Sequence, residues 1–338
     1  MLALRRGVVV EAEPGDGPER RIEVEVAGRR RAAIADIGLV GPCLVGDEVV
    51  VNVQAAELGL GSGGFDVVHV NLTRGLDAVG LPGAHVMKLN YTSLQHAVVP
   101  VEGEELVLPL ARPVGVLGLH GQLAPVTWAF AQTRPGARLG FVQTGGGALP
   151  GGHSRTVRDL RAGGLLAGHL TSGPAFGGEG EAITTVGAIH HGLHDLGWDA
   201  AVVGPGPGIL GSASALGHGG MAVLDSAHAA LALGCLTLVV PRMSSGDPRP
   251  RHQGLSHHTR TVLELLLAPV TVAFPAGEPT LVADAAGHVV RELPAPLEGY
   301  RASGLPQTTM GRTLDEDPLF FAAALVSGIA LADMLEDQ

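Results

Sequence analysis

The sequence predicts an α/β protein in which a small β-barrel-like domain precedes a Rossmann-like, three-layer domain with a mostly parallel sheet. Two patterns support this prediction. Short runs of β-forming residues, separated by turn signals, fill the first third of the 338-residue chain. From about residue 111, a strand, a glycine-rich loop and a helix follow one another repeatedly. We expect a barrel-like domain at residues 1–110, a Rossmann-like domain at 111–275, and a C-terminal hairpin and packing helix at 276–338.

The N-terminal strands are short, and turn signals such as the run from Pro14 to Gly17 separate them. Strands of this length and spacing favour a small barrel or sandwich. We expect them at residues 7–10, 21–26, 31–35, 47–53, 67–70, 86–89 and 96–101.

In the second part, strands are expected at residues 113–119, 138–143, 165–170, 199–203, 235–240 and 270–274. Helical patterns fill the gaps at residues 122–132, 153–161, 182–196, 221–233 and 256–267. Strands that alternate with helices form a parallel sheet, and ligands bind beyond the carboxyl ends of its strands. The unusual loops of this chain all fall at that edge.

The tail holds a hairpin near residues 283–288 and a terminal helix. The run from Leu319 to Ala332 is apolar nearly all round, which predicts a helix buried between domains or subunits and a candidate homodimer contact. This run is too short to span a bilayer core of ~30 Å, so no membrane association is expected.

Composition excludes several classes of function. The net charge of −11 argues against nucleic-acid binding by bulk charge. Lys88 is the single lysine, and no Gly-Lys-Ser/Thr run exists to form a P-loop. Cys43 and Cys235 are isolated from each other, which gives no disulfide framework and favours a reducing compartment. We therefore expect a soluble cytoplasmic protein.

The segment from Arg242 to Arg260 is the strongest candidate site. Its four arginines and one aspartate give a charge of +3, which leaves −14 for the rest of a chain whose net charge is −11. Planar guanidinium groups that follow a buried strand suit an anionic ligand. The alternative is a solvated loop whose arginines pair with acids elsewhere. The candidate ligand-binding residues of this segment are Arg242, Arg249, Arg251 and Ser256.

The start of the helix in this segment carries an unfavourable pair of residues. Ser256 is expected to cap the helix, which places His257 and His258 in its first turn. A cation there opposes the helix dipole, so both imidazoles should be neutral unless an anion or carboxylate lies close. A bound phosphate or carboxylate would resolve that conflict.

Two glycine-rich loops are expected to supply backbone donors to the same ligand. One is formed by Thr144, Gly145, Gly146 and Gly147, and the other contains Gly204, Gly206 and Gly208. Tight turns that need positive φ are the alternative for both loops. The second loop satisfies G-x-G-x-x-G, but no acid follows at the spacing of a dinucleotide site, so no cofactor is assigned.

Three other histidines attract attention. His120 and the loop residue Glu179 share the same sheet edge and are a candidate general base and acid, with purely structural roles as the alternative. His190 and His194 have the four-residue spacing of zinc helices, but the glutamate of that motif is missing and they end a helix whose C-terminus favours histidine. No metal ligand is assigned.

The runs VGDEVVVN (45–52), TGGGALP (144–150), FGGE (176–179), GPGPG (204–208) and RPRHQGLSHHT (249–259) together resemble a bacterial family catalogued as domain of unknown function 3866. The last of these runs is the most specific. The resemblance extends over most of the chain and implies one fold and one site, but it implies no activity or substrate.

Three hypotheses of function follow. The first is an enzyme that acts on a small anionic metabolite, held by Arg249 and Arg251, while His252, His257 or His258 moves protons and Asp247 orients one of them. The second is a non-catalytic sensor or partner-binding protein that uses the same pocket. The third is a metal-dependent hydrolase in which Asp247, His252 and either His257 or His258 bind a divalent ion.

Overall fold

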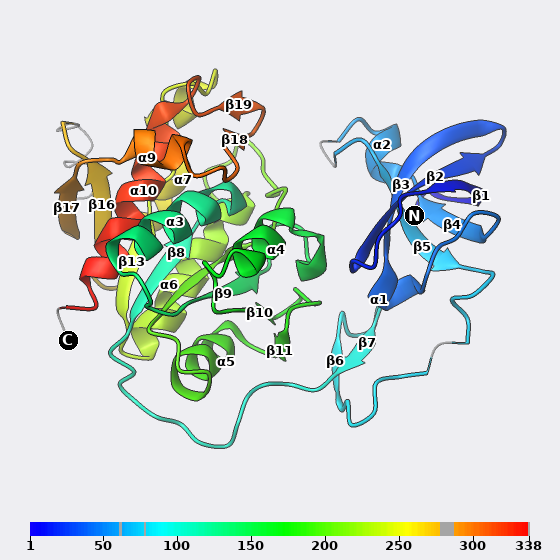
Figure 1. Cartoon of the computed structure of the whole chain (residues 1–338), viewed down its shortest axis with the longest axis horizontal. Coiled ribbons are helices and arrows are strands. Elements are labelled where there is room, and N and C mark those ends of the chain that lie inside the picture. The colour runs from blue at the N-terminus through cyan, green and yellow to red at the C-terminus, as the bar shows by residue number, and fades with distance from the viewer. Residues whose placement is uncertain (61–62, 78, 278–286, 337–338) are drawn as a thin grey trace. The chain divides into compact units, whose positions relative to one another are not determined.

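The protein is described by a computed structural model that covers residues 1–60, 63–77, 79–277 and 287–336 (Figure 1). The chain forms two compact units, residues 1–99 and 100–338. The predicted fold class is confirmed, because the first unit contains a closed barrel and the second a parallel sheet with helices on both faces. No described helix is both long and apolar enough to cross a membrane.

The first unit is a five-stranded barrel with the strand order β1-β2-β3-β5-β4. All its strand pairs are antiparallel except β3 with β5. Alternate side chains such as Val24 and Val49 are buried inside it, as the period of a strand requires. Its strands are β1 (Leu4–Ala12), β2 (Glu19–Val26), β3 (Arg29–Asp36), β4 (Glu48–Asn52) and β5 (Asp66–Asn71).

The short helices α1 (Ile37–Val40) and α2 (Gln54–Glu57) join strands of the barrel. The antiparallel pair β6 (Val86–Lys88) and β7 (His96–Val98) stands outside it. The structure has a strand at each of the seven places predicted in this part of the chain, but two of these strands form a separate hairpin.

The second unit is built on an eight-stranded sheet with the order β11-β10-β9-β12-β8-β13-β16-β17, and all its pairs are parallel. The central strands β8, β9 and β12 are buried on both faces, which accounts for their continuous apolar runs. The strands are β8 (Pro113–Leu117), β9 (Leu139–Thr144), β10 (Gly168–Ser172), β11 (Gly180–Ala182), β12 (Ala200–Pro205), β13 (Leu236–Val240), β16 (Thr271–Pro275) and β17 (Val289–Leu293).

Helices cover both faces of this sheet (Figure 1). One apolar core contains side chains of α3 (Leu123–Thr133), α4 (Arg155–Ala162) and α10 (Pro318–Asp333). The core on the opposite face contains side chains of α5 (Thr185–His190), α6 (Ala222–Ala232) and α7 (His257–Leu265). The predicted helices are confirmed, although α5 ends as a π-helical turn at His191–Asp195.

The C-terminal helix α10 lies within the second unit. Leu331 and Ala330 belong to the same core as Leu117 of β8 and Leu238 of β13, and α10 packs along α3. The expectation that this helix is buried between domains or subunits is therefore wrong, because the sheet and α3 cover its apolar surface. The structure gives no support to a homodimer contact through it.

The tail contributes two further differences. The predicted hairpin at 283–288 falls mostly outside the described residues, and the strand that follows, β17, runs parallel to β16 rather than antiparallel. A short helix, α9 (Leu297–Arg301), and the two-residue strands β18 (Thr308–Thr309) and β19 (Arg312–Thr313) then lead to α10.

The direction of the chain connections changes at one point of the sheet edge. From β8 the chain continues to β9, whereas from the adjacent strand β13 it continues to β16 on the other side. Connections that leave adjacent strands in opposite directions open a crevice beyond their carboxyl ends. The segment that begins at Arg242 follows β13 and therefore starts at this switch point.

Candidate functional site

A small antiparallel pair holds the two ends of the Arg/His segment together. Strand β14 (Met243–Ser244) pairs with β15 (Gly254–Leu255), and the Ser256 amide donates to the Arg242 carbonyl at 2.9 Å. The Arg242 amide donates to the Thr259 hydroxyl at 2.8 Å. Ser256 caps α7 as predicted, with its hydroxyl accepting from the His258 amide. These bonds fix the start of α7 beside Arg242.

Asp247 lies at the centre of an arginine cluster and is fully buried. Arg249 donates two hydrogen bonds to its carboxylate, one to Oδ1 at 2.8 Å and one to Oδ2 at 2.7 Å. A terminal nitrogen of Arg242 and one of Arg312 each lie 3.5 Å from Oδ2. The hydrogen bonds from Arg249 hold the pKa of Asp247 far below its ordinary value. Asp247 therefore orients arginines. Among the described residues, no histidine donates a hydrogen bond to Asp247, so its role in orienting a histidine stays a prediction.

A second buried aspartate, Asp317, ties this cluster to the start of α10. Its carboxylate accepts from the Ser244 hydroxyl at 2.7 Å, from the Ser245 amide at 2.8 Å and from Arg312 Nε at 3.0 Å. Charge-assisted bonds of this kind are the strongest that side chains make. The loop after β13 is thereby anchored to a segment about seventy residues away in the sequence.

Arg242 is the least compensated charge of the site. It is 4 % exposed, its Nε–H has no partner, and its bond to Asp247 is long at 3.5 Å. One terminal nitrogen donates to Nδ1 of His258 at 3.1 Å. Burial, and then the charge of Arg249, lowers the pKa of Arg242 to about 10. The site therefore contains a buried cation without a close, full counter-charge.

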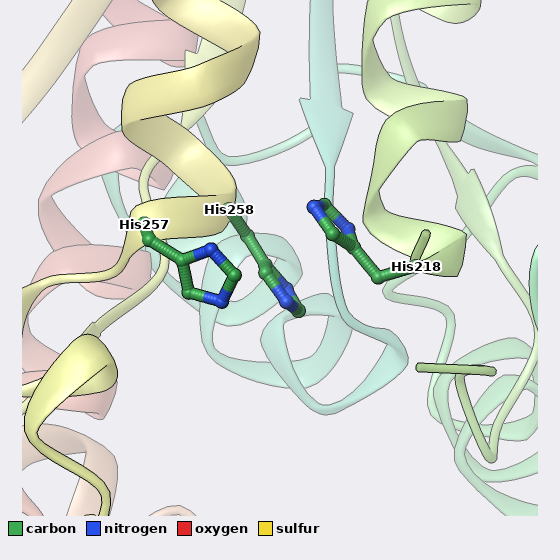
Figure 2. A group of neighbouring side chains, drawn as sticks. All are labelled: His218, His257 and His258. Carbon is green, nitrogen blue, oxygen red and sulfur yellow. The ribbon is translucent and has the colours of Figure 1, made fainter. Parts of the chain in front are cut away.

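Four imidazoles gather next to Arg242, three of which are drawn in Figure 2. The rings of His218 and His258 are stacked with centroids 3.5 Å apart and planes 9° apart. The ring of His257 lies 4.4 Å from that of His258, and the ring of His252 lies 5.0 Å from each of these two. Two of these residues open α7, whereas His218 comes from the loop between β12 and α6, immediately before a 3₁₀ turn at Gly219–Met221.

The pKa values of all four histidines are lowered. Burial is the largest cause in each case, and nearby arginines add to it. The pKa of His252 falls to about 3, and the pKa of His258 also lies far below its ordinary value. The prediction of neutral imidazoles at the start of α7 agrees with these shifts.

The chain matches the family described as Protein of unknown function (DUF3866) over residues 32–328. It belongs to this family. No curated protein matches this DUF3866 chain. Among solved structures, the crystal structure of YjeQ from Thermotoga maritima matches at 14 % identity, with a TM-score of 0.15; the match covers 65 % of this chain and 64 % of that one. A TM-score of this size supports no conclusion about the fold or function of the DUF3866 protein.

In this DUF3866 protein, the two glycine loops pack against each other. The Ala148 amide donates to the Pro207 carbonyl at 2.7 Å, and a Cβ on Gly147 would lie 2.2 Å from the Gly206 carbonyl oxygen. A Cβ on Gly146, whose φ is +103°, would lie 2.7 Å from the Gly219 carbonyl oxygen. Close backbone packing therefore explains these glycines, and their role as donors to a ligand stays a prediction.

The same packing places Gly146 against Gly219, next to His218, and His218 contacts the Arg/His segment. His218 was not predicted from the sequence as a site residue. His218 lies between Gly217 and Gly219 in the loop after β12, and its ring stacks on His258. A lone histidine within a glycine run at the carboxyl edge of a parallel sheet is a signal that could have identified it.

His120 and Glu179 each bond to other groups, and their acid–base roles stay a prediction. His120 bonds to the Ser154 hydroxyl at 2.7 Å and to the Pro205 carbonyl at 3.1 Å. The carboxylate of Glu179 is held by Arg161 at 2.6 and 3.0 Å. Burial lowers the pKa of His120 to about 4, which agrees with a neutral, structural ring.

Proposed function

We propose that this protein is an enzyme that acts on a small anionic metabolite, phosphorylated or carboxylated, at the carboxyl edge of its parallel sheet. The observation that carries the proposal is the buried, incompletely compensated charge of Arg242 at the switch point between β8 and β13. A buried guanidinium is costly unless a counter-charge approaches it. A ligand oxygen near Nε would supply that charge.

The surrounding charges favour an anion. Arg242, Arg249 and Arg312 share the carboxylates of Asp247 and Asp317. The charge of Arg251 also acts on Arg242 and His257. Arg251 is exposed, and the structure describes no hydrogen bond or ion pair for it. The Arg249 side chain is 45 % exposed beyond its bond to Asp247. We therefore propose that both side chains contact the ligand from the outer side of the site.

The metabolite itself would lie on the outer side of Arg242. The cavity between Gly118, Gly220, Arg242 and His258 has a volume of only ≈ 10 Å³, about the space of one water molecule. His252, which is buried, is the candidate proton carrier, because its Nδ1 lies 2.7 Å from the hydroxyl of Ser256. A hydroxyl bonded to an imidazole is the arrangement that proton transfer requires.

The test is a thermal-shift screen at fixed ionic strength with phosphorylated metabolites, nucleotides and carboxylates. A ligand at about 100 times its Kd should add ~2.7 kcal/mol of stability. Arg251→Ala should weaken this effect, whereas Arg30→Ala, which removes an exposed arginine of the barrel that pairs with Glu23, should not. No stabilisation by any of these anions, or an equal effect in both variants, would overturn the proposal.

Turnover separates an enzyme from a metabolite sensor. For any ligand found in the screen, His252→Gln should lower the rate of its conversion at least tenfold while leaving its Kd within a few-fold, since a proton carrier acts mainly on the chemical step. A ligand that binds through Arg251 but is never converted would instead support the sensor hypothesis.

A further inference from the structure

Two buried ring nitrogens in the histidine cluster have no hydrogen-bond partner among the described residues. One is Nδ1 of His218 and the other is Nε2 of His257. Buried polar atoms are paired in the great majority of proteins, so each exception requires an explanation. These two lie in the same cluster, which suggests one cause for both.

The hydrogen bonds show which form of His218 is present. Its Nε2 lies 2.9 Å from the carbonyl of Ala215, so Nε2 must carry the proton and donate it. The orphaned Nδ1 is therefore a lone pair that points to no donor. A histidine whose second nitrogen donates to a backbone carbonyl is the usual arrangement around a bound metal, because this bond fixes the tautomer and the orientation of the ring.

The third member is His258, and one ring nitrogen from each of His218, His257 and His258 lies within 4.8 Å of the others (Figure 2). An anion cannot satisfy the lone pair of His218, whereas a metal ion held by the three rings would take one nitrogen lone pair from each. Three histidines with one open position are typical of zinc sites, and imidazole also suits cobalt, nickel, copper and iron.

We propose that His218, His257 and His258 form a binding site for one divalent transition-metal ion of the zinc class, with a fourth position open. The ligand set differs from that of the metal-dependent hydrolase predicted from the sequence. Asp247 is occupied by its arginines, and His218 takes part instead. The site does not depend on the proposed metabolite, because the ion alone should bind.

Binding requires a local rearrangement that gives the proposal a distinctive consequence. The stacked rings of His218 and His258 lie in nearly parallel planes with centroids 3.5 Å apart, so one ring must turn before both can face one ion. Arg242 donates to Nδ1 of His258, and a metal on that ring competes with this bond. The charge of Arg242 also opposes the ion. Removing Arg242 should therefore tighten metal binding.

The experiment uses the full chain, purified without a histidine tag and stripped with a chelator, in chloride buffer free of phosphate. Competition with a chromophoric chelator measures Zn²⁺ affinity, and the visible absorption of Co²⁺ reports a four-coordinate site. We expect one equivalent to bind. His218→Ala and His257→Ala should each weaken binding by roughly 100-fold, the upper end of the loss caused by removing even an outer-shell partner. Arg242→Gln should strengthen it.

The matched control is His194→Ala. His194 lies beside another histidine, His190, with ring centroids 5.3 Å apart, but outside the proposed site. It should bind Zn²⁺ as wild type does. Circular dichroism in the presence of chelator checks that each variant is folded, and His257→Gln replaces His257→Ala if the latter is not.

Three results would overturn the metal site: no stoichiometric Zn²⁺ binding by wild type, binding lost in His194→Ala but kept in His218→Ala, or weaker binding in folded Arg242→Gln. Failure of the metal site leaves the anion proposal untouched, since the thermal-shift screen tests that proposal with anions and no added metal ion.

Discussion

Replacing Asp247 by asparagine should destabilise the second unit strongly. The carboxylate is fully buried, and one of its oxygens faces three guanidinium groups, at 2.7 Å from Arg249 and 3.5 Å from Arg242 and Arg312. Asparagine keeps the shape of the side chain, but one of its two positions becomes an NH₂ donor. In one orientation this donor faces the terminal nitrogens of the three arginines, and in the other it faces the backbone amide and Nε of Arg249. The arginines then lose their shared negative charge.

The magnitude follows from the burial of the partners. Breaking a buried ion pair by removing one member costs about 3–5 kcal/mol. The lower end applies here, because the Arg249 side chain is 45 % exposed and water can solvate it. We therefore expect Asp247→Asn to lower the free energy of unfolding by about 3 kcal/mol. Inorganic sulfate should recover part of this loss, since an anion can take the place of the carboxylate among the arginines.

Urea denaturation followed by tryptophan fluorescence is the appropriate assay. Both tryptophans, Trp128 and Trp198, belong to the second unit, so the signal reports this unit alone. The control is Asp315→Asn, which breaks a pair with Arg301 of 2.7 Å in which the aspartate side chain is 71 % exposed. It should cost much less than Asp247→Asn, because solvent screens an exposed pair. If the two substitutions cost the same, Asp247 is not the centre of a buried charge network and the reasoning fails.

Two further predictions concern stability. Burial lowers the pKa of His120 and of His169 to about 4. Their pKa in the unfolded chain is near 6.5, so their full contribution to stability is present above that pH. The free energy of unfolding therefore falls by about 2 kcal/mol per histidine between pH 7 and pH 5. His120→Gln should flatten this slope in urea titrations at the two pH values, and an unchanged slope would contradict the assignment. Gly147→Ala, whose Cβ would lie 2.2 Å from the Gly206 carbonyl oxygen, should cost about 1–3 kcal/mol, whereas Gly103→Ala, with nothing within 4 Å, should be nearly neutral. Equal melting temperatures for these two variants would show that the glycine loops are not closely packed.

Local patterns in the sequence were enough to predict most elements. The apolar runs of β8, β9 and β12 are continuous because both faces of these strands are buried, and the glycine loops mark where each one ends. The edge strands were missed for a physical reason. Strand β11 has three residues, and β17 is partly exposed, so neither carries an apolar run of its own. Strand order is equally absent from local patterns, because it is decided by packing between distant segments.

The candidate site shows the same division. The Arg/His segment could be predicted because its charge and its helix start lie within one stretch of sequence. Its partners could not, since Arg312 and Asp317 come from the segment before α10, and His218 comes from the loop after β12. The contacts of Asp317 with Ser244, Ser245 and Arg312 link segments that are far apart in the sequence, so no local pattern indicates them.

Within this cluster, some residues hold the loop in place and others have polar groups without partners among the described residues. Arg249 and Arg312 have short bonds to buried carboxylates, so they and the two aspartates fix the loop. Arg242 and the orphaned nitrogens of His218 and His257 are held in place by that frame but are incompletely satisfied themselves. A core selected only for stability would leave neither a buried cation nor buried lone pairs without partners. The unsatisfied groups include both a donor that needs an anion and acceptors that need a cation, which is the combination expected where an anionic ligand meets a metal ion.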